Sequence, residues 1–285
     1  MLGAIEAGGT KFVCAVGDDT GKIMERIQIP TTVPSETIPQ VITFFKKYLI
    51  EAIGIGSFGP IDVNLDSATY GNITSTPKPG WKDYPFVQEI KEALAVPVGF
   101  NTDVNAAALG EATIGAAKGL DSCLYITVGT GIGAGAVVQG NLLQGLSHPE
   151  MGHILVRRHP EDQYAGKCPY HQDCLEGLAA GPAIEERWGA KGIDLVQRGE
   201  VWDMEAYYIA QALMHYILIL SPKKIILGGG VMNQKQVFAS IYKYLPEFLN
   251  DYVSLLELSD YIVSPGLGDN AGIIGSLLLA KEALR

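Results

Sequence analysis

Residues 2–17, LGAIEAGGTKFVCAVG, place a glycine-rich break between two apolar runs. The runs LGAIEA and KFVCAVG have the length and composition of strands, and GGT allows a tight turn between them. From Ser122 onward, SCLYITVG, TGIG and AGAVVQ repeat the order strand, glycine turn, strand. Two unrelated hairpins are one explanation. A duplicated unit is the other, and the chain length and the helices between the two hairpins favour it.

The segments around these hairpins complete the predicted unit. After a third strand, KIMERIQIP, we expect helices over 35–48, 85–95 and 104–118, alternating with the strands AIGIGSFG and VPVGFN. The second half offers helices over 182–188 and 204–220, the strand KKIILGGG and a final helix from about residue 270. The predicted fold class is α/β with a duplicated βββαβαβα unit, and the repeat places a domain boundary near residue 118.

Composition excludes several classes of function. The chain has 285 residues, enough for one large or two moderate domains, and its formal net charge is −10. An acidic chain is a poor partner for nucleic acid or for an anionic membrane surface. We find no apolar run long enough to span a bilayer and no secretory signal after Met1, so we expect a cytoplasmic location.

Two glycine motifs resemble dinucleotide-binding loops but have the wrong context. GIGSFG at 54–59 is followed by Pro60-Ile-Asp where a helix should begin, and GLGDNA at 266–271 lies too near the end of the chain to supply the next strand. No G-x-x-x-x-G-K-[ST] occurs either. A Rossmann oxidoreductase and a P-loop protein are therefore not expected.

The glycine turns of the two hairpins are candidate phosphate sites. Turns without Cβ atoms expose N–H groups that can surround phosphate oxygens, although ordinary hairpin turns remain the alternative. A third glycine run, Gly228–Gly230, ends a predicted strand where a nucleoside could lie. The predicted phosphate-binding residues are Gly8, Gly9, Thr10 and Lys11 in the first turn, and Gly129, Thr130 and Gly131 in the second.

The stretch KCPYHQDC at 167–174 groups three metal-ligating side chains, Cys168, His171 and Cys174. Tetrahedral zinc needs a fourth ligand. A Cys168–Cys174 disulfide and chance clustering are the alternatives. The candidates for the fourth ligand are His148, His153, His159, Cys123 and Asp173.

Asp103 is the candidate catalytic carboxylate. It lies in NTDVN at the start of an Ala-rich helix, where the positive helix end would keep it ionised. Phosphoryl transfer needs such a group to accept the proton of the attacking hydroxyl. A plain N-cap aspartate is the alternative.

Seven motifs, in order along the whole chain, resemble the ROK family (repressor, open reading frame, kinase), and most closely its bacterial zinc-containing fructokinases. They are EAGGTKF at 6–12, FNTDVNAAALGE at 100–111, TVGTGIG at 127–133, HPEMGH at 148–153, CLEG at 174–177, AGPAIEERWG at 180–189 and ILGGGVM at 226–232. The resemblance implies an actin-like, ribonuclease-H-like ATPase fold with two lobes around a cleft. It also implies ATP and Mg²⁺ as cofactors and phosphorylation of a hexose at its 6-hydroxyl.

The resemblance also implies the site residues. Asp103 matches the catalytic base, and His153 matches the fourth ligand of a structural zinc in which His171 replaces a cysteine of many relatives. Glu6 stands where the wider family has Asp, and would contact Mg²⁺. The sugar ligands would be Asn101, Asp103, Glu150, His153 and Glu176; Thr130 would contact phosphate; and Pro182, Gly229, Gly230, Val231, Met232, Asn233 and Gln234 would line the adenosine site.

The resulting prediction is an ATP-dependent fructokinase that makes fructose 6-phosphate. A broader hexokinase acting on mannose or glucose and a non-catalytic sugar-sensing protein are the alternatives; a repressor would need a DNA-binding segment before the first strand. We expect an N-terminal lobe at 1–118, with the final helix, about 270–285, packing back on it. The C-terminal lobe would span 119–269 with a zinc-binding insertion at about 146–175. We also expect a homodimer.

Overall fold

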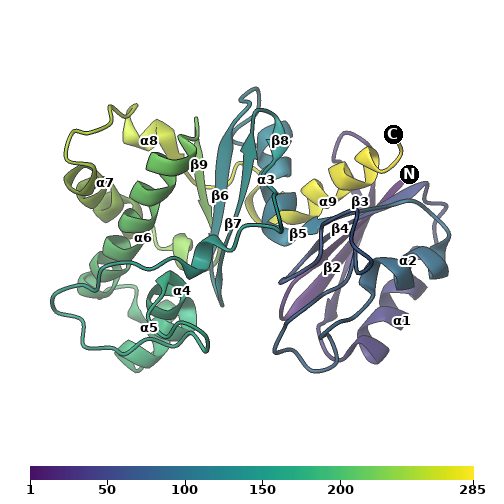
Figure 1. Ribbon diagram of the computed structural model, residues 1–285, viewed down its shortest axis with the longest axis horizontal. Helices are drawn as coiled ribbons and strands as arrows, with labels where there is room; N and C mark the ends of the chain where they lie inside the picture. The colour runs from purple at the N-terminus through teal and green to yellow at the C-terminus, as the bar shows by residue number, and fades with distance from the viewer. The chain divides into compact units, whose positions relative to one another are not determined.

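The computed structural model describes residues 1–285. It divides the chain into two compact units, each assembled from separate stretches of sequence (Figure 1). Unit 1 consists of Met1–Gly119, Gly135–Pro149 and Gly266–Arg285. Unit 2 consists of Leu120–Ala134 and Glu150–Pro265. The division differs from the predicted lobes by residues 135–149, which group with unit 1.

Unit 1 contains a mixed sheet of five strands in the order β3-β2-β1-β4-β5. Strands β1 and β2, and β2 and β3, are antiparallel, whereas β1, β4 and β5 run parallel. The elements are β1 (Leu2–Ala7), β2 (Lys11–Gly17), β3 (Ile23–Pro30), α1 (Pro34–Phe45), β4 (Ala52–Ser57), α2 (Phe86–Leu94), β5 (Val98–Thr102), α3 (Asp103–Thr113) and the C-terminal α9 (Ala271–Glu282).

The sheet of unit 1 is covered on both faces because its strands alternate between two sets of apolar side chains. In β2, Phe12 and Cys14 belong to a core with residues of α1 and α2. The residues between them, Val13 and Ala15, pack with Ile273 and Leu277 of α9. Figure 1 shows α9, in yellow, beside α3 in this unit.

Glycines allow α9 to approach its neighbours closely. A Cβ on Gly54 in β4 would lie 1.8 Å from the carbonyl oxygen of Ser276, and one on Gly275 would lie 1.7 Å from that of Ala106 in α3. Neither distance is possible for a real Cβ, so the contact requires glycine at both positions. The helix that ends the chain is therefore fitted tightly to strands that begin it.

The second sheet has the order β10-β9-β6-β7-β8; β6, β9, β10 and the start of β7 belong to unit 2, and residues 135–142 group with unit 1. Strands β6, β9 and β10 run parallel, and β7 and β8 are antiparallel. The elements after residue 120 and before α9 are β6 (Cys123–Val128), β7 (Ile132–Val138), β8 (Asn141–Leu142), α4 (Leu175–Ala179), α5 (Gly181–Trp188), α6 (Gly199–Leu220), β9 (Ile225–Gly228), α7 (Gln236–Leu249), α8 (Leu258–Tyr261) and β10 (Ile262–Val263), with 3-10 turns at Met151–His153, Gly192–Leu195 and Val231–Asn233. A further 3-10 turn, Gly268–Asn270, belongs to unit 1.

The two sheets have the same topology. Each has three consecutive strands at one side and two parallel strands, reached through helices, at the other. The predicted duplicated βββαβαβα arrangement is confirmed, with α4 to α6 filling the position of the first crossover helix in the second copy. No helix of the protein is long and apolar enough to cross a membrane.

The Ala-rich helix predicted over 104–118 is shorter in the structure, and the prediction was wrong at its C-terminal end. Helix α3 stops at Thr113. The buried carboxylate of Glu111 accepts hydrogen bonds from the backbone N–H of Ala116 at 2.6 Å and of Gly266 at 3.0 Å. The side chain of Glu111 thus takes the place of a backbone carbonyl as acceptor, and the chain leaves the helical path after Thr113.

Candidate functional site

Asp103 is the first residue of α3, directly after β5. The cap of this helix is its neighbour Thr102, whose hydroxyl accepts the N–H of Asn105 at 3.1 Å. Capping therefore does not require the Asp103 side chain, whose Oδ1 accepts the adjacent N–H of Val104 at 2.8 Å. This arrangement disfavours the plain N-cap interpretation.

Asn101 lies at the end of β5, buried beside this helix start. Its Oδ1 accepts bonds from the side-chain amide of Asn105 at 2.8 Å and from the N–H of Thr102 at 2.9 Å. These bonds fix the amide so that its NH₂ group points in one defined direction. A fixed amide donor two residues before Asp103 is suited to orienting a hydroxyl-rich ligand.

The first glycine turn joins β1 to β2. Gly8 donates its N–H to the carbonyl of Lys11 at 3.0 Å, and Thr31 donates its hydroxyl to the carbonyl of Gly8 at 2.8 Å. The N–H groups of Gly9 and Thr10 are not among the donors bound within the chain. The hydrogen bonds of Gly8 fix this turn, and its two adjacent unused N–H donors form the kind of concavity that binds an anion.

Glu6 lies in β1, immediately before this turn. Burial, and after it the charge of Asp103, raise the pKa of its carboxyl to about 7, with Lys11 opposing. Asp269, in the 3-10 turn before α9, adds to the same effect. Unit 1 therefore gathers Glu6, Asp103 and Asp269 near one another.

The second glycine turn joins β6 to β7 and differs from the first in its contacts. Gly129 donates its N–H to Gly131 at 2.9 Å and accepts one from Gly181 at 2.7 Å, so its polar groups are engaged. The carboxylate of Glu176 accepts the N–H of Ile132 at 2.9 Å. Thr130 and Gly131 keep N–H groups that are not among the donors bound within the chain.

A cavity of about 570 Å³ opens beside this turn, entirely within unit 2. That volume is in the range that holds small-molecule ligands. Seven of its lining residues are ones that the sequence predicted for phosphate or adenosine: Gly129, Thr130, Pro182, Gly230, Val231, Asn233 and Gln234. Met232 is instead buried in the core, and Gly229 turns the chain at a positive φ of 90°, where a Cβ would meet the carbonyl of Val128 at 2.4 Å.

The sequence reasoning missed the rest of this cavity. Gly181 precedes the predicted Pro182, and Ile184 and Glu185 follow it by two and three positions on α5, a spacing that could have indicated them. The segment 191–193 and Trp202 carried no such signal. The residues missed are Gly181, Ile184, Glu185, Lys191, Gly192, Ile193 and Trp202.

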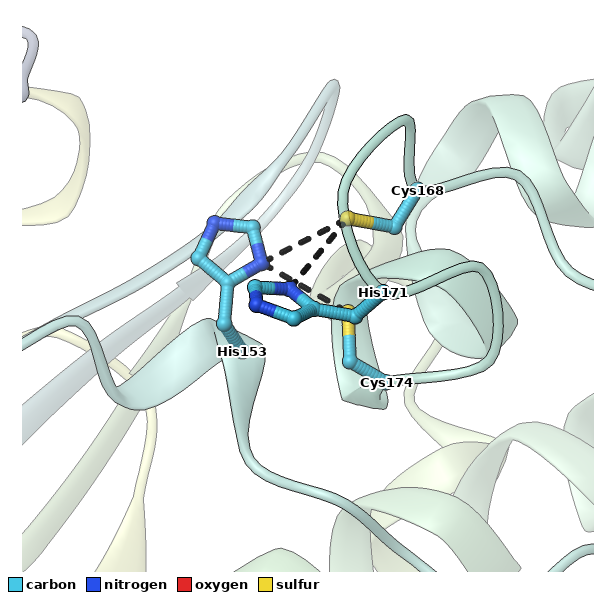
Figure 2. A group of neighbouring side chains, drawn as sticks. All are labelled: His153, Cys168, His171 and Cys174. Atoms are coloured by element: carbon cyan, nitrogen blue, oxygen red, sulfur yellow. Dashed lines mark hydrogen bonds between the residues drawn. The ribbon is translucent and has the colours of Figure 1, made fainter. Parts of the chain in front are cut away.

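Four predicted metal ligands converge in unit 2: His153, Cys168, His171 and Cys174 (Figure 2). The Nδ1 atom of His153 lies 3.7 Å from the Sγ of Cys168 and 3.5 Å from that of Cys174. The Nδ1 of His171 lies 3.7 Å from the Sγ of Cys168. Around a tetrahedral zinc with Zn–S of about 2.3 Å and Zn–N of about 2.0 Å, sulfur and nitrogen ligands are roughly 3.6 Å apart. The spacing fits such an ion.

Several of the alternatives for this cluster do not fit the structure. All four cysteines are free, so Cys168 and Cys174 form no disulfide. His148 accepts the N–H of Ile61 at 3.0 Å. Asp173 pairs with Arg158, and the ring of His159 packs on Tyr207.

Two predicted sugar ligands lie close in sequence to this cluster: Glu150 is three residues before His153, and Glu176 is two residues after Cys174. His153 donates its N–H to the carbonyl of Glu150 at 3.1 Å in a 3-10 turn. Cys174 is the N-cap residue of α4, and Glu176 is in the first turn of that helix. Partial burial and the charge of Glu176 raise the pKa of Glu150, and His153 opposes them. A metal here would fix the backbone that carries both carboxylates.

Comparison with known proteins gives the class of this fold and site. The model of the ROK family matches residues 2–283. A hexokinase of that family from Thermus thermophilus superimposes with a TM-score of 0.80 at 28% identity, over 99% of this chain and 98% of its own. The chain thus has the actin-like ATPase fold of these sugar kinases.

Curated relatives cover the whole chain at higher identity. A protein of Bacillus subtilis (strain 168) is 66% identical over 100% of this chain and 97% of its own length. A fructokinase of Pediococcus pentosaceus is 50% identical over 100% of this chain and 99% of its own. The chain belongs to the ROK family.

Proposed function

We propose that the protein is an ATP-dependent fructokinase that transfers the γ-phosphoryl group of ATP to the 6-hydroxyl of D-fructose. The main observation behind this proposal is the position of Asp103: its carboxylate lies at the start of α3, and Thr102 supplies the cap of that helix. The cavity of unit 2 supports ATP as the donor. The similarity to a fructokinase over the full chain supports fructose as the acceptor.

In this mechanism Asp103 accepts the proton of the 6-hydroxyl as that oxygen attacks the γ-phosphorus. The bond from the γ-phosphorus to the bridging oxygen breaks, and ADP leaves with the electron pair. The unused N–H groups of the two glycine turns, at Gly9, Thr10, Thr130 and Gly131, bind phosphate oxygens. Mg²⁺, when bound, neutralises charge on the phosphates, and Glu6 is the residue proposed to hold it.

The sugar-binding residues proposed are Asn101 and Asp103 of unit 1 and Glu150, His153 and Glu176 of unit 2. Carboxylates and a fixed amide accept and donate hydrogen bonds to hydroxyls in pairs, which suits a polyol. One oxygen of Glu176 is already engaged with the N–H of Ile132, so only the other is proposed for sugar.

The metal proposed for the cluster of His153, Cys168, His171 and Cys174 is zinc in a closed, structural site. Its donor set of two thiolates and two imidazoles is one that zinc accepts. Burial raises the pKa of the Cys174 thiol to about 11, so a bound cation would supply the charge that keeps it a thiolate. A homodimer and a cytoplasmic location remain predictions.

A coupled assay of ADP release with fructose, mannose and glucose as acceptors tests the function. Fructose should give the highest kcat/KM. Comparable values for glucose or mannose would instead indicate a broader hexokinase. No turnover with any hexose, while sugar still binds, would contradict the kinase and favour a non-catalytic sugar-binding protein.

A further inference from the structure

Lys78 lies in the irregular stretch TSTPKPGW at 74–81, outside every helix and strand. Its ammonium donates to the carbonyl oxygen of Gly9 in the first glycine turn. A Cβ on Gly9 would lie 3.0 Å from Nζ, so the ammonium is directly beside the backbone of that turn. It also lies 5.5 Å from the centroid of the Phe58 ring.

The position of Lys78 does not depend on its own ammonium. Three residues later Trp81 is fully buried, packs on Phe12 and Phe58, and donates its indole N–H to the carbonyl of Thr32 at 2.6 Å. Trp81 also donates its backbone N–H to the carbonyl of Lys78 at 3.2 Å. The loop is therefore held in place by the indole, and the lysine side chain is presented to the turn by a preformed backbone.

The charge of Lys78 has no counter-ion. It is half-buried, burial lowers the pKa of its ammonium, and no carboxylate acts against that effect. A partly desolvated, unpaired ammonium costs free energy, and one hydrogen bond to a carbonyl uses only one of its three donors. A neutral donor would anchor the loop at lower cost. The ammonium of Lys78 thus lies beside the two unused N–H groups of Gly9 and Thr10, in a chain whose net charge is −10.

We propose that Lys78 is a further catalytic residue, whose ammonium contacts the phosphoryl group during its transfer. This rests on the proposed kinase function. The negative charge that develops on the equatorial oxygens of the γ-phosphorus is stabilised by N–H donors of Gly9 and Thr10 and by the two free N–H bonds of Lys78. The proton of the sugar hydroxyl still goes to Asp103, and Lys78 stays protonated throughout.

Substitution of Lys78 by methionine, which keeps the length of the side chain and removes its charge, tests the proposal. Loss of one preorganised charge at a transition state lowers kcat by roughly 10²–10³-fold. KM for fructose should change by less than about threefold because the contact is made with the transferring group. The matched control is Lys82→Met, an exposed lysine of the same loop region, and it should keep the activity of the wild type.

Chemical rescue separates charge from folding. The Lys78→Cys variant should be inactive to the same degree, and alkylation with bromoethylamine, which restores an ammonium at nearly the same reach, should recover most of kcat. The four native cysteines are buried, and the wild type treated in the same way controls for their modification. No recovery in a folded variant, or a kcat of Lys78→Met within about threefold of the wild type, overturns the proposal.

A binding measurement distinguishes failure of this proposal from failure of the proposed function. ADP with Mg²⁺ and aluminium fluoride mimics the transferring phosphoryl group without requiring a hexose to be phosphorylated. Lys78→Met should weaken its binding by at least tenfold, and Lys82→Met should not. If the wild type phosphorylates no hexose but shows this difference, the function is wrong and the role of Lys78 stands. If the wild type does not bind the mimic, both are wrong.

Discussion

Asp103 and Thr102 divide two tasks that one side chain often performs alone. Thr102 caps the helix, and the carboxylate of Asp103, our proposed base, lies at the positive end of α3. The sequence NTDVN allowed either residue to be the cap, and only the backbone geometry decides between them. The choice of Asp103 as the candidate base came from the family resemblance, because its position alone favoured the ordinary role of an N-cap.

Replacing Asp103 by asparagine should lower kcat by about 10²–10⁴-fold, the usual contribution of a general base. Because Thr102 keeps the cap, the free energy of unfolding should change little. Single-turnover kinetics and urea denaturation measure the two quantities. Nearly normal turnover would remove Asp103 as the base, and Thr102→Ala, which should lose stability by about 1 kcal/mol, is the reciprocal control.

The buried environment of Glu205 makes the stability of the protein depend on pH. Glu205 lies in α6, its two carboxylate oxygens are buried without a hydrogen-bond partner, and burial raises its pKa well above the ordinary value, with Arg187 offsetting only a part. The native state therefore keeps a proton that the unfolded chain releases above about pH 4.5. The unfolded state then binds fewer protons, so the free energy of unfolding falls as pH rises from that value.

Glu205→Gln removes this dependence, because the amide cannot ionise in either state. Relative to the wild type, the variant should gain stability with rising pH, by at most about 1.4 kcal/mol per pH unit. Urea unfolding of both proteins across the neutral range measures the gain. Glu247→Gln, at an exposed position of α7, should show no such trend. A constant difference between the Glu205 variant and the wild type would contradict the assignment.

At the scale of elements, the four proposed zinc ligands, His153, Cys168, His171 and Cys174, all lie in the segment 150–176. This segment contains little regular structure. Isolated bridges join Leu155 to Cys174 and Cys168 to Gln172, and the buried Asp162 pairs with Arg187 of α5. The spacing C-x2-H-x2-C was enough to predict three ligands, because a short loop brings them together locally. The fourth, His153, lies fifteen residues before Cys168, and its choice among five candidates required the family resemblance.

Removal of one ligand should empty this site. Elemental analysis should find about one zinc ion per chain in the wild type and almost none in Cys168→Ser, with a lower melting temperature and weaker fructose binding. Cys14→Ala, which changes a cysteine of the β2 core, should keep its zinc. His171→Cys should keep it too, because thiolate and imidazole are equally good ligands. A fully active, metal-free wild type would contradict the site.

The cavity of unit 2 includes residues that prediction from sequence did not find. Its glycines and Pro182 could be predicted because turns and helix starts have recognisable residues. Lys191 and Ile193 belong to a short 3-10 turn and its edge, and Trp202 to the start of α6. Nothing in their local sequence distinguishes them from other surface or core residues, and tertiary packing alone brings them to the cavity. Lys78 was missed for the same reason, since its position follows from the burial of Trp81.

For the whole molecule, the chain passes between the two units four times, after residues 119, 134, 149 and 265. The duplicated topology was predictable because each copy begins with the same glycine hairpin. The return of residues 135–149 to unit 1 was not predicted, because those residues continue the second hairpin without a break in sequence pattern. Neither unit is therefore a continuous segment that can be cut out at a single boundary.

Deletion of residues 271–285 should prevent unit 1 from folding. Without α9, one face of its sheet loses the cover of Ile273, Leu277 and Ala280, and the buried Leu2, Ala4 and Val13 become exposed. We expect an insoluble product, or one without a cooperative unfolding transition. Deletion of residues 283–285, which follow the helix, should leave the melting temperature unchanged within a few degrees. A folded, soluble protein lacking α9 would contradict this view of the fold.

The position of α9 also sets an order of events during synthesis. All of unit 2 has been translated by residue 265, whereas unit 1 lacks the helix that closes its sheet until residues 271–282 have been added. Domains fold as units while the ribosome is still adding residues. Unit 1 can complete its folding only after α9 has been synthesised. Unit 1, which carries Asp103, is therefore begun before unit 2 and completed after it.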